Sequence, residues 1–496
     1  MNEYFPNRIG NEDDVSGDKY MLKSPVNGSV IGYGYMGNRE TVSRAIESSA
    51  DAFAKWSSVP LIERKRIILK LSEIMQEKAD KYAYLESLNT GKTLRQSTFF
   101  DTSLSIEHVR YFATSDDFKA ERKILHPEYP GTEGIIQYCP MGVVASIVPW
   151  NVPLLMAIWK SVPPILSGNT VILKPSHYTP VTAIELSRDF AKAGLPPGVL
   201  NIVSGEGSVV GETLAKSSQV RVLSFTGSTA TGMKVSEMAA GTIKRVIMEL
   251  GGKSPNIVFD DADMDRAARG ILMGIFLHSG QLCESGSRLL VQKNAMEKLL
   301  HRLRFYMGKI HPGDPLDMTT DLSAITTLKQ KEKIEGMVHN GIQDGARIGL
   351  KVDIDGQVPR GGIYYPPLIL EDVYPDMEIF REEIFGPVLT ITEFENENEA
   401  IELANDTRYG LAGGIWTSNT QKALKIAGKI DAGTLWINDY HLASAAAPRG
   451  GFKDSGIGRE LGLEGILEYT QTRHIFVRNK NDELSDVAFG LICSDQ

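Results

Sequence analysis

Apolar and polar residues in the first part of this chain follow the spacing of an amphipathic helix. One apolar face contains Val42, Ala45, Ile46, Phe53 and Trp56, with polar residues between them. A second helical pattern follows, with Ile67, Leu71, Ile74 and Met75 on its apolar face. The segment Ser58-Val59-Pro60 interrupts the pattern between the two. The spacing therefore predicts two consecutive helices that are separated by a turn.

From about residue 140 the pattern changes to short apolar segments that alternate with helical ones. The apolar segments are 142–148, 170–174, 199–203, 220–224 and 245–249, and a helical pattern runs over 181–193. This alternation predicts a parallel sheet with helices on both faces. Nucleotides bind at the carboxyl ends of the strands in such sheets, and Asn151, Lys174 and Glu249 stand at those ends.

A second α/β pattern runs over residues 252–455. Its strand candidates are 288–291, 388–392 and 434–437. Two further extended segments, 135–139 and 474–478, have no neighbouring strand in the sequence. Because an exposed sheet edge promotes aggregation, we expect these two segments to pair, and a small sheet shared between subunits would satisfy them.

Composition limits the classes of protein to which this chain can belong. A length of 496 residues predicts two to four domains. The net charge of −9 argues against a nucleic-acid or membrane partner. The cysteines, Cys139, Cys283 and Cys493, are too few for a disulfide framework, and neither they nor the nine histidines have metal-ligand spacing. We therefore expect a cytoplasmic protein without a metal site, and the polar N-terminus lacks the apolar core of a secretory signal.

Three residues could carry chemistry, and each also has an inert interpretation. Cys283 lies in a Gly/Ser-rich turn and could be a nucleophile, but taken alone it is better explained as a buried free cysteine. Glu249 ends an apolar strand and is followed by two glycines. It could be a general base, or it could be a helix cap without a catalytic role. Asn151 lies between two prolines, where its amide could donate to an oxyanion or bond its own backbone.

Two segments could bind a nucleotide. The small residues of Phe225–Gly232 and of Lys174–His177 would let backbone N–H groups approach a phosphate. Neither segment has the G-x-G-x-x-G pattern, and Gly205-Glu206-Gly207 matches it only in part, as a loop would.

Taken together and in order, seven sequence blocks make the chain resemble the aldehyde dehydrogenase superfamily from about residue 25 to about residue 478. The blocks are PWN (149–151), KPS (174–176), FTGST (225–229), ELGGKSP (249–255), GQxC (280–283), EEIFGPV (382–388) and GGFKxSGxGRE (450–460). An accidental match of seven ordered blocks is negligible.

The resemblance implies a function and a role for each matching residue. The function is oxidation of an aldehyde to a carboxylic acid by NAD or NADP, through a cysteine thiohemiacetal and a thioester. The implied catalytic residues are the nucleophile Cys283, the base Glu249 and the oxyanion donor Asn151. The implied cofactor-binding residues are Trp150, Lys174, Ser176, His177, Gly227, Ser228, Glu383 and Phe385, and the substrate residues are Trp159 and Arg449.

The resemblance also implies an α/β architecture of three parts. A Rossmann-like dinucleotide-binding domain would comprise residues 1–120 and 141–251, and a catalytic α/β domain residues 252–455. A small β oligomerisation element would comprise residues 121–140 and 456–496. The expected assembly is a homodimer or a homotetramer.

The chain departs from the family pattern at three positions. His177 replaces a glutamate that excludes the 2′-phosphate in NAD-preferring members, which slightly favours NADP unless the histidine is simply solvated. Glu284 could disfavour the thiolate, bind a cationic substrate or point away, and we expect the last. Arg449 could clamp a substrate carboxylate or phosphate, but an intersubunit or surface salt bridge is the stronger expectation. Val152, Leu277 and Ala443 match other substrate-tunnel positions, and they suit a medium-sized aldehyde.

Three alternative functions remain open. An acylating enzyme that transfers the acyl group to coenzyme A is disfavoured, because Glu249 is present for hydrolysis. A non-catalytic binding protein is disfavoured by the joint presence of Cys283, Glu249 and Asn151. A specialised semialdehyde dehydrogenase would differ only in its substrate.

Overall fold

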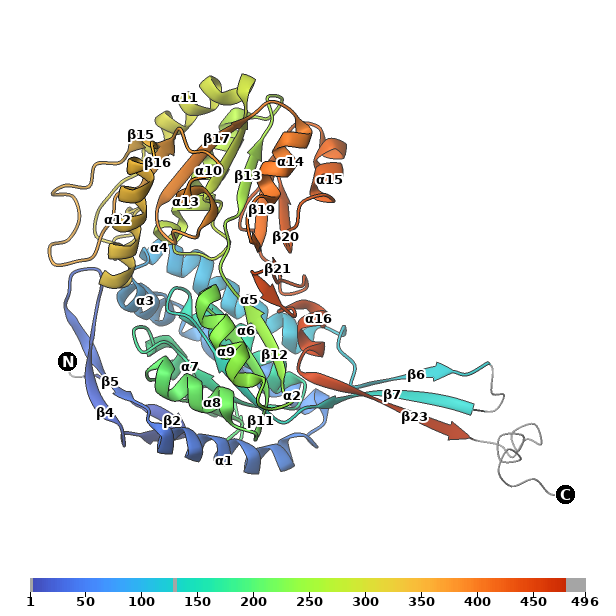
Figure 1. Ribbon diagram of the computed structural model, residues 1–496. Helices are drawn as coiled ribbons and strands as arrows, with labels where there is room; N and C mark the ends of the chain where they lie inside the picture. Colours follow the sequence, from blue (N-terminus) through green and yellow to red (C-terminus); the bar gives the residue numbers. More distant parts are fainter. Residues whose placement is uncertain (1–2, 128–131, 479–496) are drawn as a thin grey trace.

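The computed structural model describes residues 3–127 and 132–478, and it contains two large sheets, one above the other in Figure 1. The lower sheet has eight strands. In spatial order they are β22 (Gly456–Ile457), β12 (Arg245–Glu249), β11 (Val220–Thr226), β8 (Val143–Ile147), β9 (Thr170–Lys174), β10 (Leu200–Ile202), β2 (Asn7–Ile9) and β3 (Glu12–Asp14). The five strands from β12 to β10 are parallel, whereas β22, β2 and β3 add antiparallel edges.

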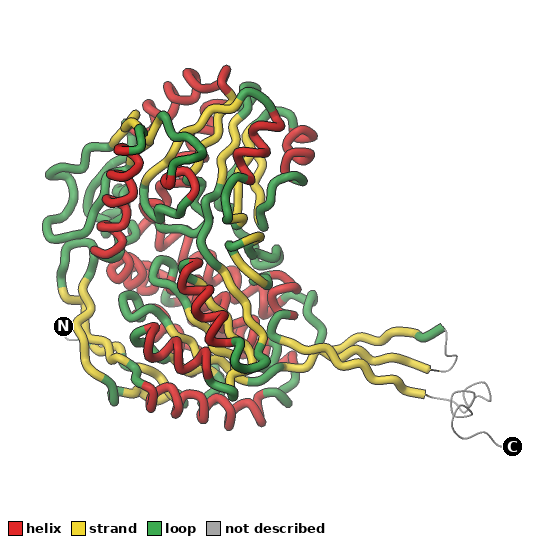
Figure 2. Tube along the Cα trace, viewed as in Figure 1, coloured by secondary structure: helices red, strands yellow, loops and turns green. Residues whose placement is uncertain are grey.

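Helices cover both faces of this sheet, as the alternating pattern predicted (Figures 1 and 2). One face packs on α1 (Arg39–Trp56), α8 (Glu212–Lys216) and α9 (Thr229–Ala239). The other packs on α6 (Pro153–Leu166) and α7 (Val181–Lys192), with α2 (Leu61–Glu77), α3 (Ala79–Thr90) and α5 (Ser103–Thr114) outside them. Side chains alternate along each strand, so that Ile147 faces one layer and Val144 the other. The two helices predicted before residue 77 are confirmed as α1 and α2.

The upper sheet has seven strands and is mostly parallel. Its order is β15 (Arg347–Lys351), β16 (Leu368–Glu371), β17 (Val388–Phe394), β14 (Arg288–Gln292), β13 (Pro255–Val258), β19 (Ala412–Trp416) and β20 (Thr434–Ile437). Its helices are α10 (Met264–Phe276), α11 (Met296–Met307), α12 (Leu328–Gln343), α13 (Glu378–Arg381), α14 (Glu397–Asn405) and α15 (Thr420–Ala427). Apolar clusters lie on both faces of the sheet, and the three strands predicted from the sequence, β14, β17 and β20, are confirmed.

A third, smaller sheet projects from the body of the molecule (Figures 1 and 2). It contains β23 (Thr470–Arg478), β7 (Thr132–Pro140) and β6 (Glu121–Leu125), all antiparallel. The two segments that lacked a neighbour in the sequence therefore pair with each other, for example at His474 and Ile136. Whether this sheet is shared between subunits stays a prediction.

The remaining elements are short. A three-stranded sheet contains β1 (Tyr4–Phe5), β5 (Val30–Met36) and β4 (Asp18–Lys23), and β18 (Tyr409–Gly410) pairs with β21 (Phe452–Lys453). α4 (Leu94–Gln96) and the π-helix η1 (Ser97–Thr102) lie before α5, and α16 (Gly462–Leu467) lies before β23. In the described part of the chain, no helix combines the length and apolar character that crossing a bilayer requires.

Candidate active site

A cavity of about 180 Å³ contains most of the residues that the sequence singled out. Its walls include Trp150, Asn151, Trp159, Gly227, Ser228, Glu249, Cys283, Glu383, Phe385 and Arg449. They come from the ends of β8, β11 and β12 in the lower sheet and from loops of the upper sheet. Of the other tunnel positions, Val152 and Ala443 line this cavity, whereas Leu277 lines a different one.

Asn151 lies between the end of β8 and the first turn of α6. Its side chain is buried, and its Nδ2 donates to the carbonyl of Gln281 over 2.7 Å. An amide nitrogen carries two hydrogens, so one N–H remains for a ligand in the cavity. Among the described residues, Asn151 Oδ1 has no hydrogen-bond partner. The side chain is therefore tied to the loop that carries Cys283 and keeps one donor free.

Cys283 lies on the loop between the 3-10 helix η3 (Leu277–Gly280) and β14. Its backbone carbonyl closely approaches Gly252, where a Cβ atom would stand 2.5 Å from that oxygen. Only glycine fits there, which gives one of the two glycines after Glu249 a steric reason. Burial raises the pKa of the Cys283 thiol well above its usual range, and the carboxylate of Glu284 adds to this effect. The resting group is therefore a neutral thiol.

Glu249 ends β12 and lines the same cavity. Burial raises the pKa of its carboxyl to about 8, and the neighbouring Glu460 carboxylate adds to this shift. Within the described residues, Glu249 Oε1 has no hydrogen-bond partner although it is buried. A carboxyl with a pKa near neutral pH and an oxygen without a hydrogen-bond partner is suited to exchange a proton with water.

Sequence reasoning missed the buried charges behind Glu249. Lys160 forms a hydrogen-bonded ion pair with Glu460, and its Nζ also donates to Ser224 Oγ over 2.7 Å. Lys160 interrupts the otherwise apolar middle of α6, where every residue is buried. A lone lysine in such a helix is the signal that could have identified a buried ion pair.

The cofactor candidates fall into two groups in space. Glu383, Phe385, Trp150, Gly227 and Ser228 line the cavity with Cys283. Phe385 has a positive φ of 59° and meets the Trp150 ring edge to face at 5.4 Å. Glu383 Oε1 accepts from the Gly252 N–H over 3.1 Å. These contacts join the upper sheet to the ends of the lower one.

Lys174, Ser176 and His177 lie outside this cavity, at and after the end of β9. Since β9 is the neighbour of β8, with Lys174 opposite Ile147, they extend the same edge of the sheet. His177 Nε2 is 3.8 Å from Glu206 Oε1. Burial lowers the pKa of the His177 imidazole despite the charge of Glu206, so the ring is neutral at pH 7.

The expectations for Glu284 and Arg449 were wrong. Glu284 does not point away, because it lines the cavity and its Oε2 accepts from Arg449 Nη2 over 2.5 Å. The salt bridge of Arg449 is therefore neither a surface nor an intersubunit contact. The expectation for Glu284 relied on strand geometry, in which adjacent side chains face opposite ways. Cys283 and Glu284 lie in a turn, where this alternation does not apply.

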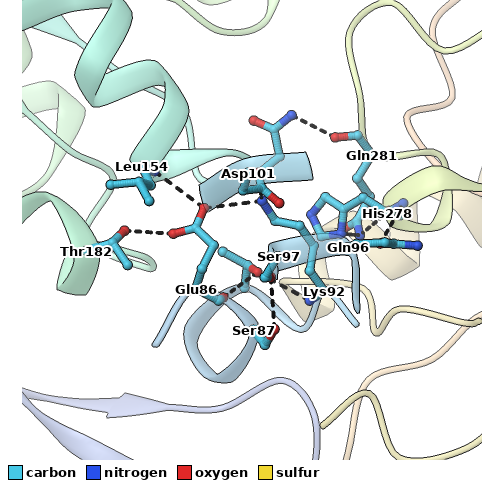
Figure 3. Close-up of polar contacts among 12 residues, drawn as sticks. Glu86, Ser87, Lys92, Gln96, Ser97, Asp101, Leu154, Thr182, His278 and Gln281 are labelled. Carbon is cyan, nitrogen blue, oxygen red and sulfur yellow. Dashed lines mark hydrogen bonds and ion pairs between the residues drawn. The ribbon is translucent and has the colours of Figure 1, made fainter. Parts of the chain in front are cut away.

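A buried ionic cluster lies near His278, which precedes the loop of Cys283 (Figure 3). Lys92 Nζ is 3.2 Å from Glu86 Oε1 and 2.5 Å from Asp101 Oδ1. The Glu86 carboxylate also accepts from the Leu154 N–H over 3.4 Å and from Thr182 Oγ1 over 2.7 Å. It thereby satisfies a free backbone donor in the first turn of α6, directly after Asn151.

Gln281 holds the other side of this loop (Figure 3). Its Nε2 donates to the carbonyls of His278, at 2.9 Å, and Ala324, at 3.0 Å. The turn before it is strained, with His278 at φ 49° and Ser279 at φ 50°. The side-chain bonds of Gln281, together with the bond from Asn151 to its carbonyl, therefore fix the backbone that leads to Cys283.

Replacing Lys92 by methionine should lower the free energy of unfolding by about 3–5 kcal/mol, because two buried carboxylates would lose their cation. The midpoint of denaturant unfolding measures the change. Lys425→Met, at an exposed position of α15, is the control and should stay within about 0.5 kcal/mol of the wild type. Equal midpoints for the two variants would contradict the role of the cluster.

Comparison with known proteins finds aldehyde dehydrogenases both among similar sequences and among similar structures. The model of the aldehyde dehydrogenase family matches residues 13–475. A betaine aldehyde dehydrogenase of Bacillus subtilis is 40% identical over 473 residues, which cover 94% of this chain and 96% of that protein. A betaine aldehyde dehydrogenase of Brucella anthropi is 36% identical over 471 residues, 94% of this chain and 95% of that one.

Solved structures superimpose closely on this fold. A betaine aldehyde dehydrogenase of Staphylococcus aureus in complex with NAD⁺ matches with a TM-score of 0.92 and 36% identity, over 96% of this chain and 95% of the other. An NAD-dependent aldehyde dehydrogenase of Sinorhizobium meliloti matches with a TM-score of 0.93 and 36% identity, over 97% and 96%.

Proposed function

This chain belongs to the aldehyde dehydrogenase family and oxidises an aldehyde to a carboxylic acid through a cysteine, and we propose that Cys283, Glu249 and Asn151 carry out the reaction. The observation that supports this assignment is their convergence on one cavity from two different sheets. The test is production of reduced cofactor from a panel of aldehydes. Cofactor binding without turnover of any aldehyde would favour the non-catalytic alternative.

In the proposed mechanism the thiol of Cys283 loses its proton to water, and its sulfur attacks the carbonyl carbon of the aldehyde. The free N–H of the Asn151 amide donates to the oxygen as it becomes negative, and one such donor contributes roughly 10²–10³ in rate. Loss of the former aldehyde hydrogen as a hydride, for which the bound cofactor would supply the acceptor, leaves a thioester on Cys283. Glu249 then removes a proton from water, which attacks this thioester. The acid leaves and the sulfur is restored. Glu249 is the reason to reject an acylating enzyme, since hydrolysis needs a base.

A nicotinamide dinucleotide fits the edge of the lower sheet. Gly227 and Ser228 stand at the start of α9, where an anion is stabilised by the helix terminus. The N–H of Gly227 itself donates to the carbonyl of Glu249 over 3.1 Å, which fixes this turn against β12. A Cβ atom at Gly251 would stand 2.7 Å from Glu383 Oε2, so the glycine lets this carboxylate reach the cavity wall. Glu383 would hold a ribose, Phe385 and Trp150 would flank the nicotinamide, and Lys174 and Ser176 would face the adenosine side. When bound, the oxidised cofactor supplies the ring that accepts the hydride.

We further propose that NAD is preferred to NADP. The preference for NADP that the sequence suggested rests on the loss of an excluding glutamate and on the attraction of a protonated His177, but this ring is neutral and lies beside the carboxylate of Glu206. A carboxylate at that point repels a 2′-phosphate, as the glutamate that His177 replaces would do. The solved relatives named above also hold or use NAD.

Replacing Glu206 by glutamine should raise kcat/KM for NADP relative to NAD roughly threefold or more, a modest factor because the carboxylate is exposed and screened. Initial rates with the two cofactors measure the ratio. Glu237→Gln, exposed on α9, is the control and should leave it unchanged. A ratio that Glu206→Gln does not move would remove Glu206 from cofactor selection.

The division into domains is also part of this proposal. The lower sheet would be the dinucleotide-binding domain, the upper sheet the catalytic domain, and the projecting sheet the oligomerisation element of a homodimer or homotetramer. The pairing of β22 with β12 supports counting residues 456–457 with the lower sheet, although the sequence assigned them to the oligomerisation element. Residues 128–131 and 479–496 of that element lie outside the described residues.

A further inference from the structure

Three ionisable side chains form a cluster at the cavity wall beside Cys283. Glu284 Oε2 accepts from Arg449 Nη2 over 2.5 Å, and Glu284 Oε1 is 2.9 Å from His441 Nδ1. Arg449 and His441 are buried, and Glu284 and Arg449 line the cavity. We call Glu284, Arg449 and His441 the cavity cluster.

The hydrogen bonds of His441 determine how many protons this cluster holds. His441 Nε2 is 3.1 Å from the carbonyl of Gly274, which can only accept, so this nitrogen carries a hydrogen. A neutral ring would then turn the lone pair of Nδ1 toward the carboxylate of Glu284. A proton must lie between the two, either on the imidazole or on the carboxyl.

Both placements of that proton give the cavity cluster one more positive than negative charge, because Arg449 is always protonated. Burial alone raises the pKa of the Glu284 carboxyl, but Arg449 and His441 outweigh it and hold the pKa below its usual value. The carboxyl of Glu284 is thus favoured in its ionised form. Elsewhere on the wall, burial raises the pKa of Glu249 and Glu383, while Lys333 adds a positive charge.

Arg449 also lies close to two aromatic rings. Its guanidinium carbon lies 5.7 Å from the ring centroids of both Trp159 and Trp436. Trp159 is held in place by its Nε1, which donates to His108 Nδ1 over 2.9 Å. An ammonium ligand would need an aromatic face or a free carboxylate, and Arg449 engages the Trp159 face and the carboxylate of Glu284. Two other rings on the cavity wall, Trp150 and Phe385, are those assigned above to the nicotinamide.

Arg449 keeps donors for a ligand. In the described part of the chain, its guanidinium makes one hydrogen bond, from Nη2 to Glu284. The other N–H groups of a guanidinium form a planar fork that matches a carboxylate. Arg449 thus presents charge and unused donors to the space next to the nucleophile.

We propose that the cavity cluster makes this enzyme selective for aldehydes whose tail carries a carboxylate, and that it disfavours tails with a trimethylammonium group. This inference rests on the function proposed above and specifies its substrate class. It separates this chain from the relatives whose names specify betaine aldehyde, a trimethylammonium compound. It also favours the semialdehyde alternative over a general aldehyde dehydrogenase.

The test compares three aldehydes with NAD: 4-oxobutanoate, its neutral methyl ester and betaine aldehyde. The wild type should use 4-oxobutanoate with a kcat/KM roughly 10- to 100-fold above that of the ester, the factor expected for a hydrogen-bonded charge pair. Betaine aldehyde should be the poorest of the three. Equal or better use of the ester or of betaine aldehyde would overturn the proposal while leaving the proposed function intact. No turnover of any of the three would instead overturn the proposed function.

Two variants isolate the charge of Arg449. In Glu284→Gln the amide can donate to a neutral His441, so the cluster keeps its excess positive charge and the preference for 4-oxobutanoate should persist. Glu284→Gln combined with Arg449→Met removes that charge without leaving an unpaired carboxylate, and the preference should fall roughly 10- to 100-fold through KM. Because the ratio of two substrates is measured, a general loss of activity cancels. An unchanged ratio in the double variant would overturn the proposal.

Discussion

Replacing Cys283 by serine should lower aldehyde oxidation at least about 10³-fold and leave cofactor affinity nearly unchanged. Burial already raises the pKa of the thiol well above its usual range, and a serine hydroxyl in the same place ionises far less readily. An alkoxide is also a poorer leaving group than a thiolate, so the second half of the reaction would slow as well. The absorbance of the reduced cofactor measures turnover, and fluorescence titration measures cofactor binding.

Cys139 provides the matched control for this substitution. It is a free cysteine in β7 of the projecting sheet and does not line the cavity. Cys139→Ser should therefore retain the activity of the wild type. A Cys283→Ser variant that kept a tenth or more of the activity would reject Cys283 as the nucleophile.

Replacing Glu249 by glutamine should stop the reaction after one turnover. The enzyme would form the thioester and release one equivalent of reduced cofactor, but no base would activate the water. Stopped-flow absorbance should show a burst equal to the enzyme concentration, and the intact mass should rise by the acyl group. In the wild type, the rate of deacylation should rise as the pH increases through about 8, because Glu249 acts in its deprotonated form.

Glu237→Gln is again a suitable control, since Glu237 is exposed on α9. It should show neither a burst followed by arrest nor a changed pH profile. Steady turnover in Glu249→Gln at the rate of the wild type would mean that another group activates the water.

The parallel strands could be predicted from the sequence because both of their faces are buried. A strand such as β9, Thr170–Lys174, is buried at every position and therefore appears as a continuous apolar segment. The N-terminal strands β4 and β5 gave no such signal, since their residues are largely exposed or half-buried and two glycines interrupt β5. Their pairing depends on contacts that no local pattern contains.

The catalytic residues could be identified because each lies in a conspicuous block of sequence, but their surroundings could not. Glu284 and Arg449 are separated by 165 positions in the chain, and nothing local indicates that they form an ion pair. The expectation that Glu284 points away relied on the geometry of a strand, whereas the residue lies in a turn. Charge pairs between distant loops follow from the fold as a whole, so they appear only when the two sheets are assembled.

The short connection between the two sheets has a consequence for motion. β12 ends at Glu249 and β13 begins at Pro255, so the backbone passes from one sheet to the other beside the catalytic residues. Gly252, within this connection, touches the backbone of Cys283. A change in the angle between the two sheets would therefore displace Glu249 and Cys283 relative to each other less than it would displace residues far from this connection.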